Sequence, residues 1–226
     1  MRWWEHASLS YVARTAAVVA ALGIVVIGTA PMALAAVNRQ ADPILSEALN
    51  GTPNALDTPA PPFQLTDQRG LPVGLADLRG HVVALTFLDP VCTSDCPLIA
   101  QEFRQTDQQL SGQSGRVDFV AIVANPIYRS VSYTNAFDQQ EGLTHLPNWY
   151  FLTGPVASLQ RAWDSYGVQV QSVANGAMVA HSDLAFVIDA RGHERDALLD
   201  DPGPTQVTAS SFSSLLLSRI QLALNS

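Results

Sequence analysis

The sequence predicts an α/β fold in which helices flank a mixed central sheet. Apolar runs of strand length occur at residues 82–88, 117–124 and 148–154. Segments with a helical spacing of apolar residues lie between and after them. Apolar runs without polar alternation are typical of strands that are buried on both faces. Strand and helix patterns that alternate along a chain favour an α/β layer architecture.

An uncharged segment near the N-terminus predicts export or membrane attachment. No charged residue occurs from Thr15 to Val37, and arginines flank this stretch, which is long enough to cross a bilayer at about 20 residues. Residues 1–38 are therefore predicted to be a transmembrane anchor or a signal peptide with a small-residue cleavage pattern at residues 33–35. Arginines before the apolar run favour a cytoplasmic N-terminus. The rest of the chain is then expected at the extracytoplasmic face, single-pass anchored or exported after cleavage.

The remaining chain is predicted to be a linker followed by one domain. Residues 39–62 are polar and rich in proline, alanine and asparagine, which indicates a flexible linker. Residues 63–226 are enough for a single hydrophobic core. The formal net charge is −8, and the 12 basic residues are all scattered arginines. Without a basic patch that could release phosphate counterions, the chain is not expected to bind nucleic acid.

The first half of the domain is expected to contain a hairpin, a buried strand and a helix. Gly70 supplies the positive φ that a tight turn needs, which favours a β-hairpin over residues 63–75. The strand of residues 82–88 follows, and Pro97 suits the first turn of the next helix. The spacing of four apolar residues predicts one buried face for this helix: Leu98, Ile99, Phe103 and Leu110.

The second half is expected to alternate in the same way and to close with a hairpin and a helix. The predicted elements are a strand at 117–124, a helix at 130–140, a strand at 148–154, a helix at 155–168, a hairpin at 184–199 and a helix at 209–224. The turn of the hairpin is placed at residues 189–192. The apolar face of the last helix is Phe212, Leu215, Leu216, Ile220 and Leu224. This order of elements matches thioredoxin-like architecture.

The only two cysteines, Cys92 and Cys96, follow the first core strand in the stretch DPVCTSDCPLIA. A structural disulfide between them would add little stability, because loop-closure entropy grows with loop length. At the start of a helix the macrodipole lowers a thiol pKa and favours a reactive thiolate. The thioredoxin motif has two residues between its cysteines and this stretch has three. Redox chemistry and chelation of copper(I), which soft sulfur ligands select, are both open.

A metal held by two sulfurs needs a third ligand, and His181 is the candidate. The other histidines fit less well, because they precede the apolar segment, begin a strand, lie in a polar loop or sit beside arginines: His6, His81, His145 and His193. Met178 and Asp183 lie near His181 in sequence and are candidates for a further copper(II) donor. Asp95, between the cysteines, is a candidate for attracting a cation. An ordinary loop role explains Met178 and Asp183 better, and it explains Asp95 at least as well.

Four stretches, in this order and spacing, resemble the Sco/SenC family of membrane-tethered, thioredoxin-like copper proteins: FQLTDQRGLPVGLADLRGHVVALTFLDPVCTSDCP, NPIYRSVSYTNAF, YFLTGPVASLQRAWDSYGV and VAHSDLAFVIDARG. The resemblance implies that Cys92, Cys96 and His181 are ligands of a copper ion, Cu(I) or Cu(II). It implies a metallochaperone that delivers copper to, or reduces the cysteines of, the copper site of cytochrome c oxidase. The implied partners are the copper-bearing subunit of the oxidase or another cuproprotein, and thioredoxin-like reductants.

The chain departs from the family pattern around the expected ligands. The family usually has an aromatic residue and threonine before the first cysteine and proline after it, where this chain has Leu88, Asp89, Pro90 and Thr93. The family segment DPxRDTP is replaced by NPIYRSVS from Asn125, and Ala180 replaces the aspartate before the histidine. All three expected ligands are retained.

Two alternative functions use the same cysteines. The first is an extracytoplasmic thiol-disulfide oxidoreductase that cycles Cys92 and Cys96 without an obligate metal and needs no histidine. The second is a peroxidase of the same fold, with one attacking thiolate and one resolving thiol. The spacing and placement of the cysteines match the copper family better than a peroxidase.

Overall fold

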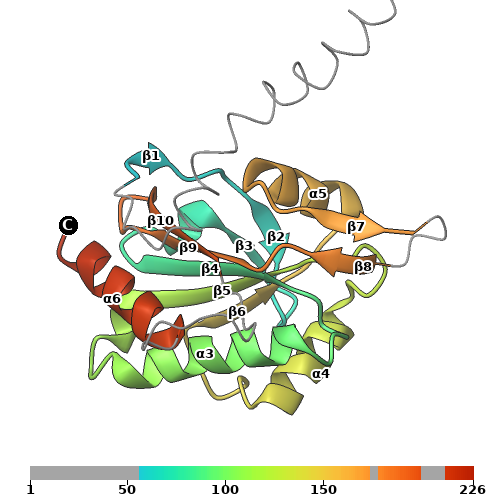
Figure 1. The fold of residues 1–226 in the computed structure, drawn as a ribbon, viewed down its shortest axis with the longest axis horizontal. Coiled ribbons are helices and arrows are strands. Elements are labelled where there is room, and N and C mark those ends of the chain that lie inside the picture. The colour runs from blue at the N-terminus through green and yellow to red at the C-terminus, as the bar shows by residue number, and fades with distance from the viewer. Residues whose placement is uncertain (1–55, 174–177, 200–211) are drawn as a thin grey trace, which may run out of the picture. The chain divides into compact units, whose positions relative to one another are not determined.

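The computed structural model describes residues 56–173, 178–199 and 212–226. Its central sheet has six strands in the order β1-β10-β9-β4-β5-β6 (Figure 1). β4, β5 and β6 run parallel to one another. β9 runs antiparallel to β4, β10 antiparallel to β9, and β1 antiparallel to β10. The bounds of the five longer strands are β4 (Val82–Leu88), β5 (Val117–Val123), β6 (Trp149–Leu152), β9 (Leu184–Ile188) and β10 (His193–Leu199). The predicted mixed sheet is confirmed.

The centre of the sheet is buried on both faces, as the continuous apolar runs predict. Every residue of β4 and β5 is buried. The two strands pair in parallel from Val82 opposite Val117 to Leu88 opposite Val123. β9 is also fully buried and runs antiparallel to β4. Helices must therefore cover both sides of these strands.

In the described residues, four helices cover the sheet: α3 (Asp95–Gln109), α4 (Val131–Glu141), α5 (Val156–Ser165) and α6 (Phe212–Leu224). The connections β4-α3-β5 and β5-α4-β6 step across the sheet in one direction, so right-handed crossovers place α3 and α4 on the same face. Figure 1 shows α6 beside α3 on that face and α5 on the other. Among the described residues, this arrangement agrees with the predicted order of helices.

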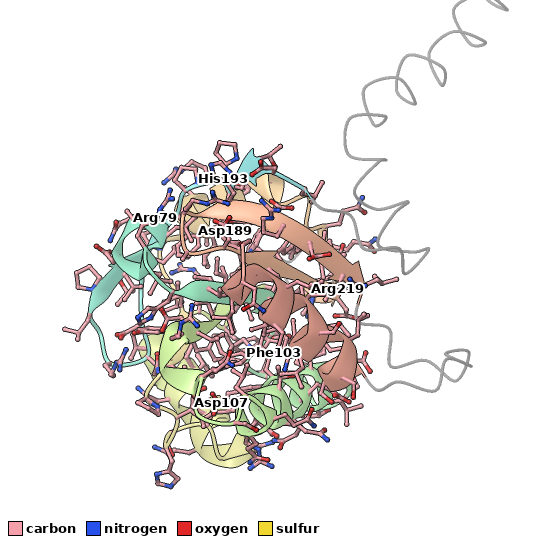
Figure 2. The ribbon with its side chains drawn as sticks, turned by 90° about the vertical axis from the view of Figure 1, so that its left-hand side faces the viewer. Arg79, Phe103, Asp107, Asp189, His193 and Arg219 are labelled. Atoms are coloured by element: carbon pink, nitrogen blue, oxygen red, sulfur yellow. The ribbon has the colours of Figure 1, made fainter. Side chains whose placement is uncertain are left out.

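The contact between α3 and α6 is built on Phe103 (Figure 2). Its ring stacks on Phe212 of α6 at 6.5 Å between centroids and meets Phe119 of β5 edge-on at 5.9 Å. The prediction that Leu98 shares this buried face is wrong, because its side chain is 54% exposed. Leu98 is one residue before Ile99, and successive residues point about 100° apart around a helix.

Among the described residues, one hairpin lies within the central sheet and two form separate two-stranded sheets. The predicted hairpin of β2 (Gln64–Thr66) and β3 (Pro72–Gly74) is confirmed, and so is the pairing of β9 with β10. Gly192 closes the second turn with a φ of +77°. The pairing of β7 (Val170–Ser172) with β8 (Met178–His181) was not predicted. Short 3-10 turns lie at Leu75–Leu78 and Ser114–Arg116.

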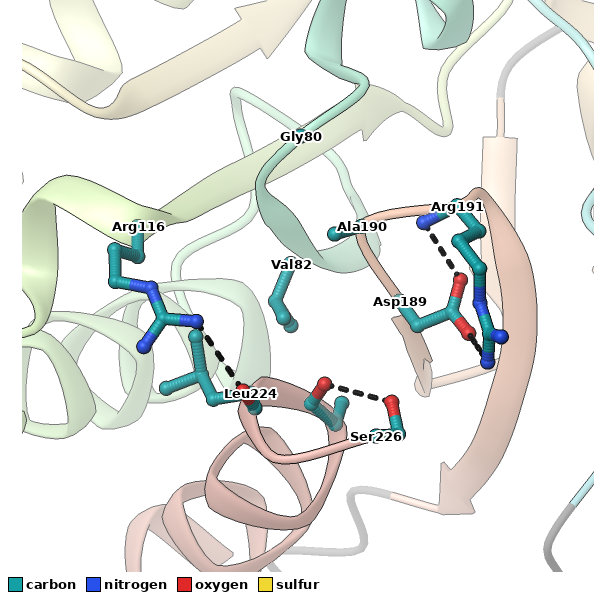
Figure 3. Close-up of a pocket in the computed structure, with 9 residues that line it drawn as sticks. Gly80, Val82, Arg116, Asp189, Ala190, Arg191, Leu224 and Ser226 are labelled. Carbon is teal, nitrogen blue, oxygen red and sulfur yellow. Dashed lines mark hydrogen bonds and ion pairs between the residues drawn. The ribbon is translucent and has the colours of Figure 1, made fainter.

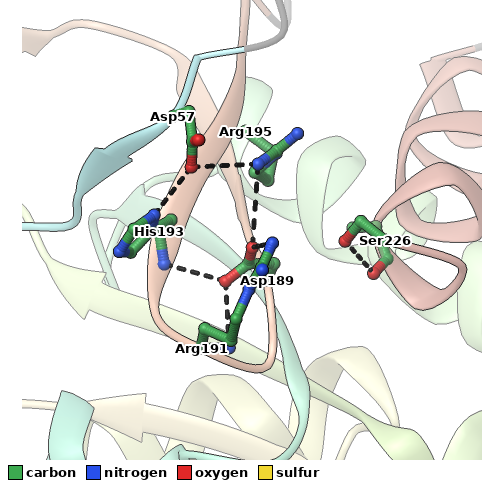
Figure 4. Close-up of polar contacts among 7 residues, drawn as sticks. Asp57, Asp189, Arg191, His193, Arg195 and Ser226 are labelled. Carbon is green, nitrogen blue, oxygen red and sulfur yellow. Dashed lines mark hydrogen bonds and ion pairs between the residues drawn. The ribbon is translucent and has the colours of Figure 1, made fainter.

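The sheet begins earlier than the predicted domain boundary at residue 63. β1 (Thr58–Pro59) pairs with β10 inside the segment that was expected to be linker. Just before it, one Asp57 oxygen lies 2.7 Å from His193 Nδ1 and 3.1 Å from Arg195 Nη1, both on β10 (Figure 4). These contacts fix the last residues before the domain to the edge of the sheet.

The predicted anchor or signal segment, residues 1–38, lies outside the described residues. Residues 39–55 of the predicted linker also lie outside them. Within the described ranges, no helix has the length and apolarity needed to cross a membrane.

Candidate metal centre

Strand order brings the two halves of the expected site together. The loop with Cys92 and Cys96 follows the C-terminal end of β4. Because β9 runs antiparallel to β4, the residues just before β9 lie next to the residues just after β4. The Thr86 hydroxyl fixes this junction by donating to the Leu184 carbonyl at 3.0 Å. His181 is the last residue of β8, three residues before β9, and therefore reaches the cysteine loop.

Cys96 is the centre of the cluster. Its side chain is buried in the first turn of α3 and its Sγ lies 3.3 Å from His181 Nε2, although the two residues are 85 positions apart in the chain. Cys92 is half-buried, packs against the core and lies with its Sγ 3.4 Å from Ser94 Oγ. Cys92 precedes Cys96 by four positions in the same loop, and both are free thiols.

The contacts of His181 Nδ1 determine the tautomer of the ring, and therefore which nitrogen presents its lone pair to the cysteines. The His181 side chain is 6% exposed, and Nδ1 lies 3.4 Å from Asp183 Oδ1 and 3.3 Å from the Ser182 carbonyl oxygen. Both neighbours are acceptors, so Nδ1 carries the proton in the neutral ring. Nε2 is then unprotonated and points at Cys96 Sγ. A partner that holds Nδ1–H in this way is typical of metal-binding histidines.

The cysteine pair is electrostatically asymmetric. The hydrogen bond with the Cys96 thiol, helped by Ser94, lowers the pKa of Cys92 to about 4. The same bond, together with burial, raises the pKa of the Cys96 thiol above its usual range. Cys92 is therefore the nucleophilic thiolate and Cys96 the protonated partner.

We expect an alkylating reagent to modify Cys92 well before Cys96 in the folded protein. At about pH 6, roughly 2 units above the Cys92 pKa, the Cys92 thiolate is almost fully formed, and Cys96 is both buried and protonated. Mass spectrometry of iodoacetamide-treated protein at increasing times measures the order. A Cys92→Ser variant should label slowly when folded and fully in urea. Equal rates at the two cysteines in the parent would contradict this asymmetry.

The other candidate residues from the sequence differ in what they contact. Asp183 contacts the His181 ring and is positioned to orient it. Asp95 is exposed and accepts a hydrogen bond from Ser94 at 3.5 Å. Met178 begins β8 and pairs with Ser172 of β7. Among the remaining described histidines, His81 contacts Asp118 and His193 contacts Asp57, both away from the cysteines, and His145 is exposed before β6.

Two residues that sequence reasoning did not assign also belong to the site. Asp89 is buried directly after β4, and its backbone N–H donates to Cys96 Sγ at 3.3 Å. Asn125 is buried after β5, and its Oδ1 accepts backbone N–H groups from Ile127 at 2.8 Å and Tyr128 at 3.0 Å. Both positions are departures from the family pattern. In the sequence, the only signal for these two residues is that each is a polar residue that follows an apolar run of strand length.

A separate pocket lies at the opposite end of the sheet (Figure 3). It is lined by residues around the start of β4, the turn between β9 and β10, and the end of α6, including Gly80, Val82, Arg116, Asp189 and Leu224. Arg116 and the Leu224 carbonyl are joined across it at 3.2 Å. The cysteines follow the other end of β4, so this pocket is not part of their site.

Of the three expected ligands, Cys96 and His181 contact each other, and Cys92 lies in the loop directly before Cys96. In the part of the chain that the structure describes, no three histidine, cysteine, aspartate or glutamate side chains already form a metal-binding group. The donor set of two sulfurs and one imidazole nitrogen nevertheless fits a soft or borderline metal. Binding would require Cys92 to come together with Cys96 and His181 at a common centre.

Solved structures of known proteins share the fold of this chain. ScoI from Bradyrhizobium japonicum, solved with copper bound, is 18% identical, with a TM-score of 0.60 over 74% of this chain and 99% of ScoI. A SCO1/SenC family lipoprotein from Bacillus anthracis is 21% identical, with a TM-score of 0.62 over 76% and 97%. BsSco, a Sco family member with a disulfide switch, is 19% identical, with a TM-score of 0.59 over 75% and 95%.

No curated protein sequence matches the chain. The sequence profile of the SCO1/SenC family, however, matches residues 51–215, which include both cysteines and His181. The structural neighbours share the mixed sheet and its helices over nearly their whole length. The chain belongs to the SCO1/SenC family.

Proposed function

We propose that the chain binds one copper ion through Cys92 Sγ, Cys96 Sγ and His181 Nε2. The observation that carries the proposal is the 3.3 Å contact between Cys96 Sγ and His181 Nε2, with Cys92 four residues before Cys96 in the same loop. Two soft sulfurs and one imidazole suit copper(I), and copper(II) accepts the same set with one more donor. Copper is then a cargo, which the site receives and passes on.

We further propose that the protein is a redox-active assembly factor for the copper site of cytochrome c oxidase. BsSco belongs to a family of cytochrome c oxidase assembly proteins, which supports this role. The dithiol can act in two ways: it can transfer copper, or it can reduce a disulfide of the copper-bearing subunit. In the second case Cys92 and Cys96 form one S–S bond, and their two electrons and two protons convert the partner disulfide to two thiols.

The proposed location is the extracytoplasmic face of the membrane, where residues 1–38 would anchor the chain or direct its export. The B. anthracis relative is a lipoprotein, which is consistent with attachment at that face. A thioredoxin-like reductant in this compartment would return the disulfide form to the dithiol.

A thiol-disulfide oxidoreductase without an obligate metal is the second candidate. It is favoured by the pairing of a half-exposed, low-pKa Cys92 with a buried Cys96, since an attacking and a resolving thiol need this asymmetry. Turnover of a disulfide substrate that is undiminished in a His181→Ala variant would favour this function over copper binding.

Copper titration in two redox states tests the proposed site. The reduced protein is expected to bind one copper(I) per chain in competition with a chelator, because both thiolates are available. The disulfide form is expected to lose nearly all of this binding, since a disulfide sulfur is a far weaker ligand than a thiolate. Copper binding that is the same in both states would refute the assignment of the cysteines as ligands.

A further inference from the structure

The loop after β4 begins with a tight turn over residues 89–92. The Asp89 side chain supports this turn, because its Oδ1 accepts the Val91 N–H at 3.1 Å. The Asp89 carbonyl closes the turn by accepting the Cys92 N–H at 3.1 Å. Aspartate at the first position and proline at the second, here Pro90, both favour a β-turn, since the carboxylate bonds the backbone two residues on and proline presets φ. Cys92 occupies the fourth position of the turn.

The same two hydrogen bonds form the turns of two hairpins in the described part of the chain. Asp189, between β9 and β10, accepts the Arg191 N–H with Oδ1 at 2.9 Å and the Gly192 N–H with its carbonyl at 2.7 Å. Asp67 makes both bonds at 2.9 Å in the turn between β2 and β3. A glycine ends each hairpin turn, whereas the loop after β4 has Cys92 at that position. A turn that elsewhere reverses a strand therefore holds a thiol here.

Asp89 itself is held in place by the central sheet. It directly follows Leu88, the last residue of β4, whose carbonyl accepts the Ala124 N–H at 2.8 Å just after β5. Asp89 is 5% exposed, and its backbone N–H donates to Cys96 Sγ at 3.3 Å. Asp89 therefore contacts both halves of the cysteine pair, Cys96 directly and Cys92 through the turn.

We propose that Asp89 is a positioning residue that restricts Cys92 for copper binding through the bond from the Val91 N–H to Oδ1. The inference rests on the proposed function, since it concerns the same ligands. A thiol held in a turn has less conformational freedom to lose when it joins Cys96 and His181 at the metal, and such preorganisation raises affinity. The place of the Asp89 oxygen in the turn, and not its charge, has this effect.

Two substitutions at this position separate the place of the oxygen from its charge. Asp89→Asn keeps an Oδ1 for the Val91 N–H and removes the charge. Asp89→Glu keeps the charge but moves the carboxylate one methylene further from the backbone, and only the short aspartate and asparagine side chains form this turn. A charge that attracts the copper ion would make Asp89→Asn the weaker binder, whereas the positioning role makes Asp89→Glu the weaker one.

We expect Asp89→Glu to weaken copper(I) binding by the reduced protein about tenfold, the ratio that corresponds to one hydrogen bond to a carboxylate. Asp89→Asn should stay within about threefold of the parent, since a neutral amide oxygen makes a somewhat weaker bond. The matched control is Asp189→Glu, the same change in the same kind of turn at the opposite end of the sheet, which should bind as tightly as the parent. Anaerobic competition with a copper(I) chelator measures all four proteins.

Amide hydrogen exchange of the copper-free proteins is a second readout. The Cys92 N–H bonds to the backbone carbonyl of residue 89, which none of the substitutions removes, so its exchange rate reports the turn itself. In Asp89→Glu this exchange should be about tenfold faster than in the parent, and in Asp89→Asn it should stay within about threefold. In Asp189→Glu it should be unchanged.

Copper(I) affinity or Cys92 exchange that is equal in Asp89→Glu and the parent would overturn the proposal. An Asp89→Asn variant that binds copper(I) more weakly than Asp89→Glu would also overturn it. If Asp89→Glu does not fold, Asp89→Ala, which removes the acceptor, replaces it with the same direction of change expected. A parent that binds no copper would refute the proposed function, whereas the exchange measurements would still decide whether Asp89 holds the turn.

Discussion

Replacing His181 with alanine is expected to weaken copper(II) binding by about 100-fold or more, because even the partners that orient metal ligands are typically worth 10- to 100-fold in affinity. His181 supplies an imidazole nitrogen with a free lone pair, which the structure brings to 3.3 Å from Cys96 Sγ. Copper(I) binding should fall less, since two thiolates alone satisfy a soft ion better than they satisfy copper(II). Competition titrations with a chelator, under anaerobic conditions, measure both affinities.

In His181→Ala, the reduction potential of the Cys92–Cys96 dithiol should be almost unchanged. We expect its reduction potential to move by less than about 30 mV, the value that corresponds to a tenfold change in the equilibrium. The control is His145→Ala, since His145 is exposed and precedes β6 at the other end of the sheet. Copper(II) affinity that is equal in His181→Ala and the parent would rule out the three-ligand site.

Replacing Asp138 with asparagine is expected to change the pH dependence of folding stability. Asp138 is 0% exposed. Its Oδ1 accepts the Trp149 indole N–H at 2.9 Å. Its Oδ2 has no hydrogen-bond partner among the residues that the structure describes. Burial raises the pKa of Asp138 to about 7. The folded state therefore holds its proton after the unfolded chain has lost it.

Because the folded state binds this extra proton, folding stability falls as pH rises. Stability is fully retained below the pKa of the unfolded aspartate, near 4, and is lost as pH rises toward the folded value of about 7. Between about pH 5 and pH 8 the parent should lose about 2 to 3 kcal/mol that Asp138→Asn does not lose, at 1.36 kcal/mol per pH unit. Asparagine keeps the acceptor for Trp149 and carries no charge at either pH.

Urea unfolding of both proteins at the two pH values measures this change. Asp164→Asn, at an exposed position of α5, is the control and should follow the parent. Glu194 and Asp196 also have raised pKa values from burial, but they are common to all three proteins and cancel in the comparison. A stability difference between parent and Asp138→Asn that is the same at both pH values would contradict the assignment.

Much of the fold could be predicted because the central strands leave a simple pattern. Strands β4 and β5 are buried on both faces, and burial on both faces selects the continuous apolar runs that predict them. The start of α3 was also predictable from Pro97 and the spacing of Ile99 and Phe103. The position of the cysteines at a strand-to-helix junction followed from these two elements.

The elements that were not predicted are short and lie at exposed edges. β7 is half-buried to exposed along its length, so no alternation of polar and apolar residues marks it. β1 has only two residues and contains Pro59, which suits an edge strand. In both cases pairing with a distant segment, rather than local preference, decides the structure.

The three expected ligands could be proposed from the sequence, but the residues that hold them in place could not. Cys92, Cys96 and His181 were expected together because of the family resemblance. The placement of the loops that carry Asp89 and Asn125 depends on how β4 and β5 lie in register, and no local pattern in either loop encodes that register. The same holds for the Asp183 contact that fixes the His181 tautomer.

The most direct test of the central claim is the X-ray absorption spectrum of the copper(I)-loaded, reduced protein. The proposed site predicts two sulfur scatterers and one nitrogen scatterer of imidazole type around each copper, and loss of the nitrogen in His181→Ala. A first shell that contains sulfur alone in the parent, or that is identical in parent and variant, would contradict it.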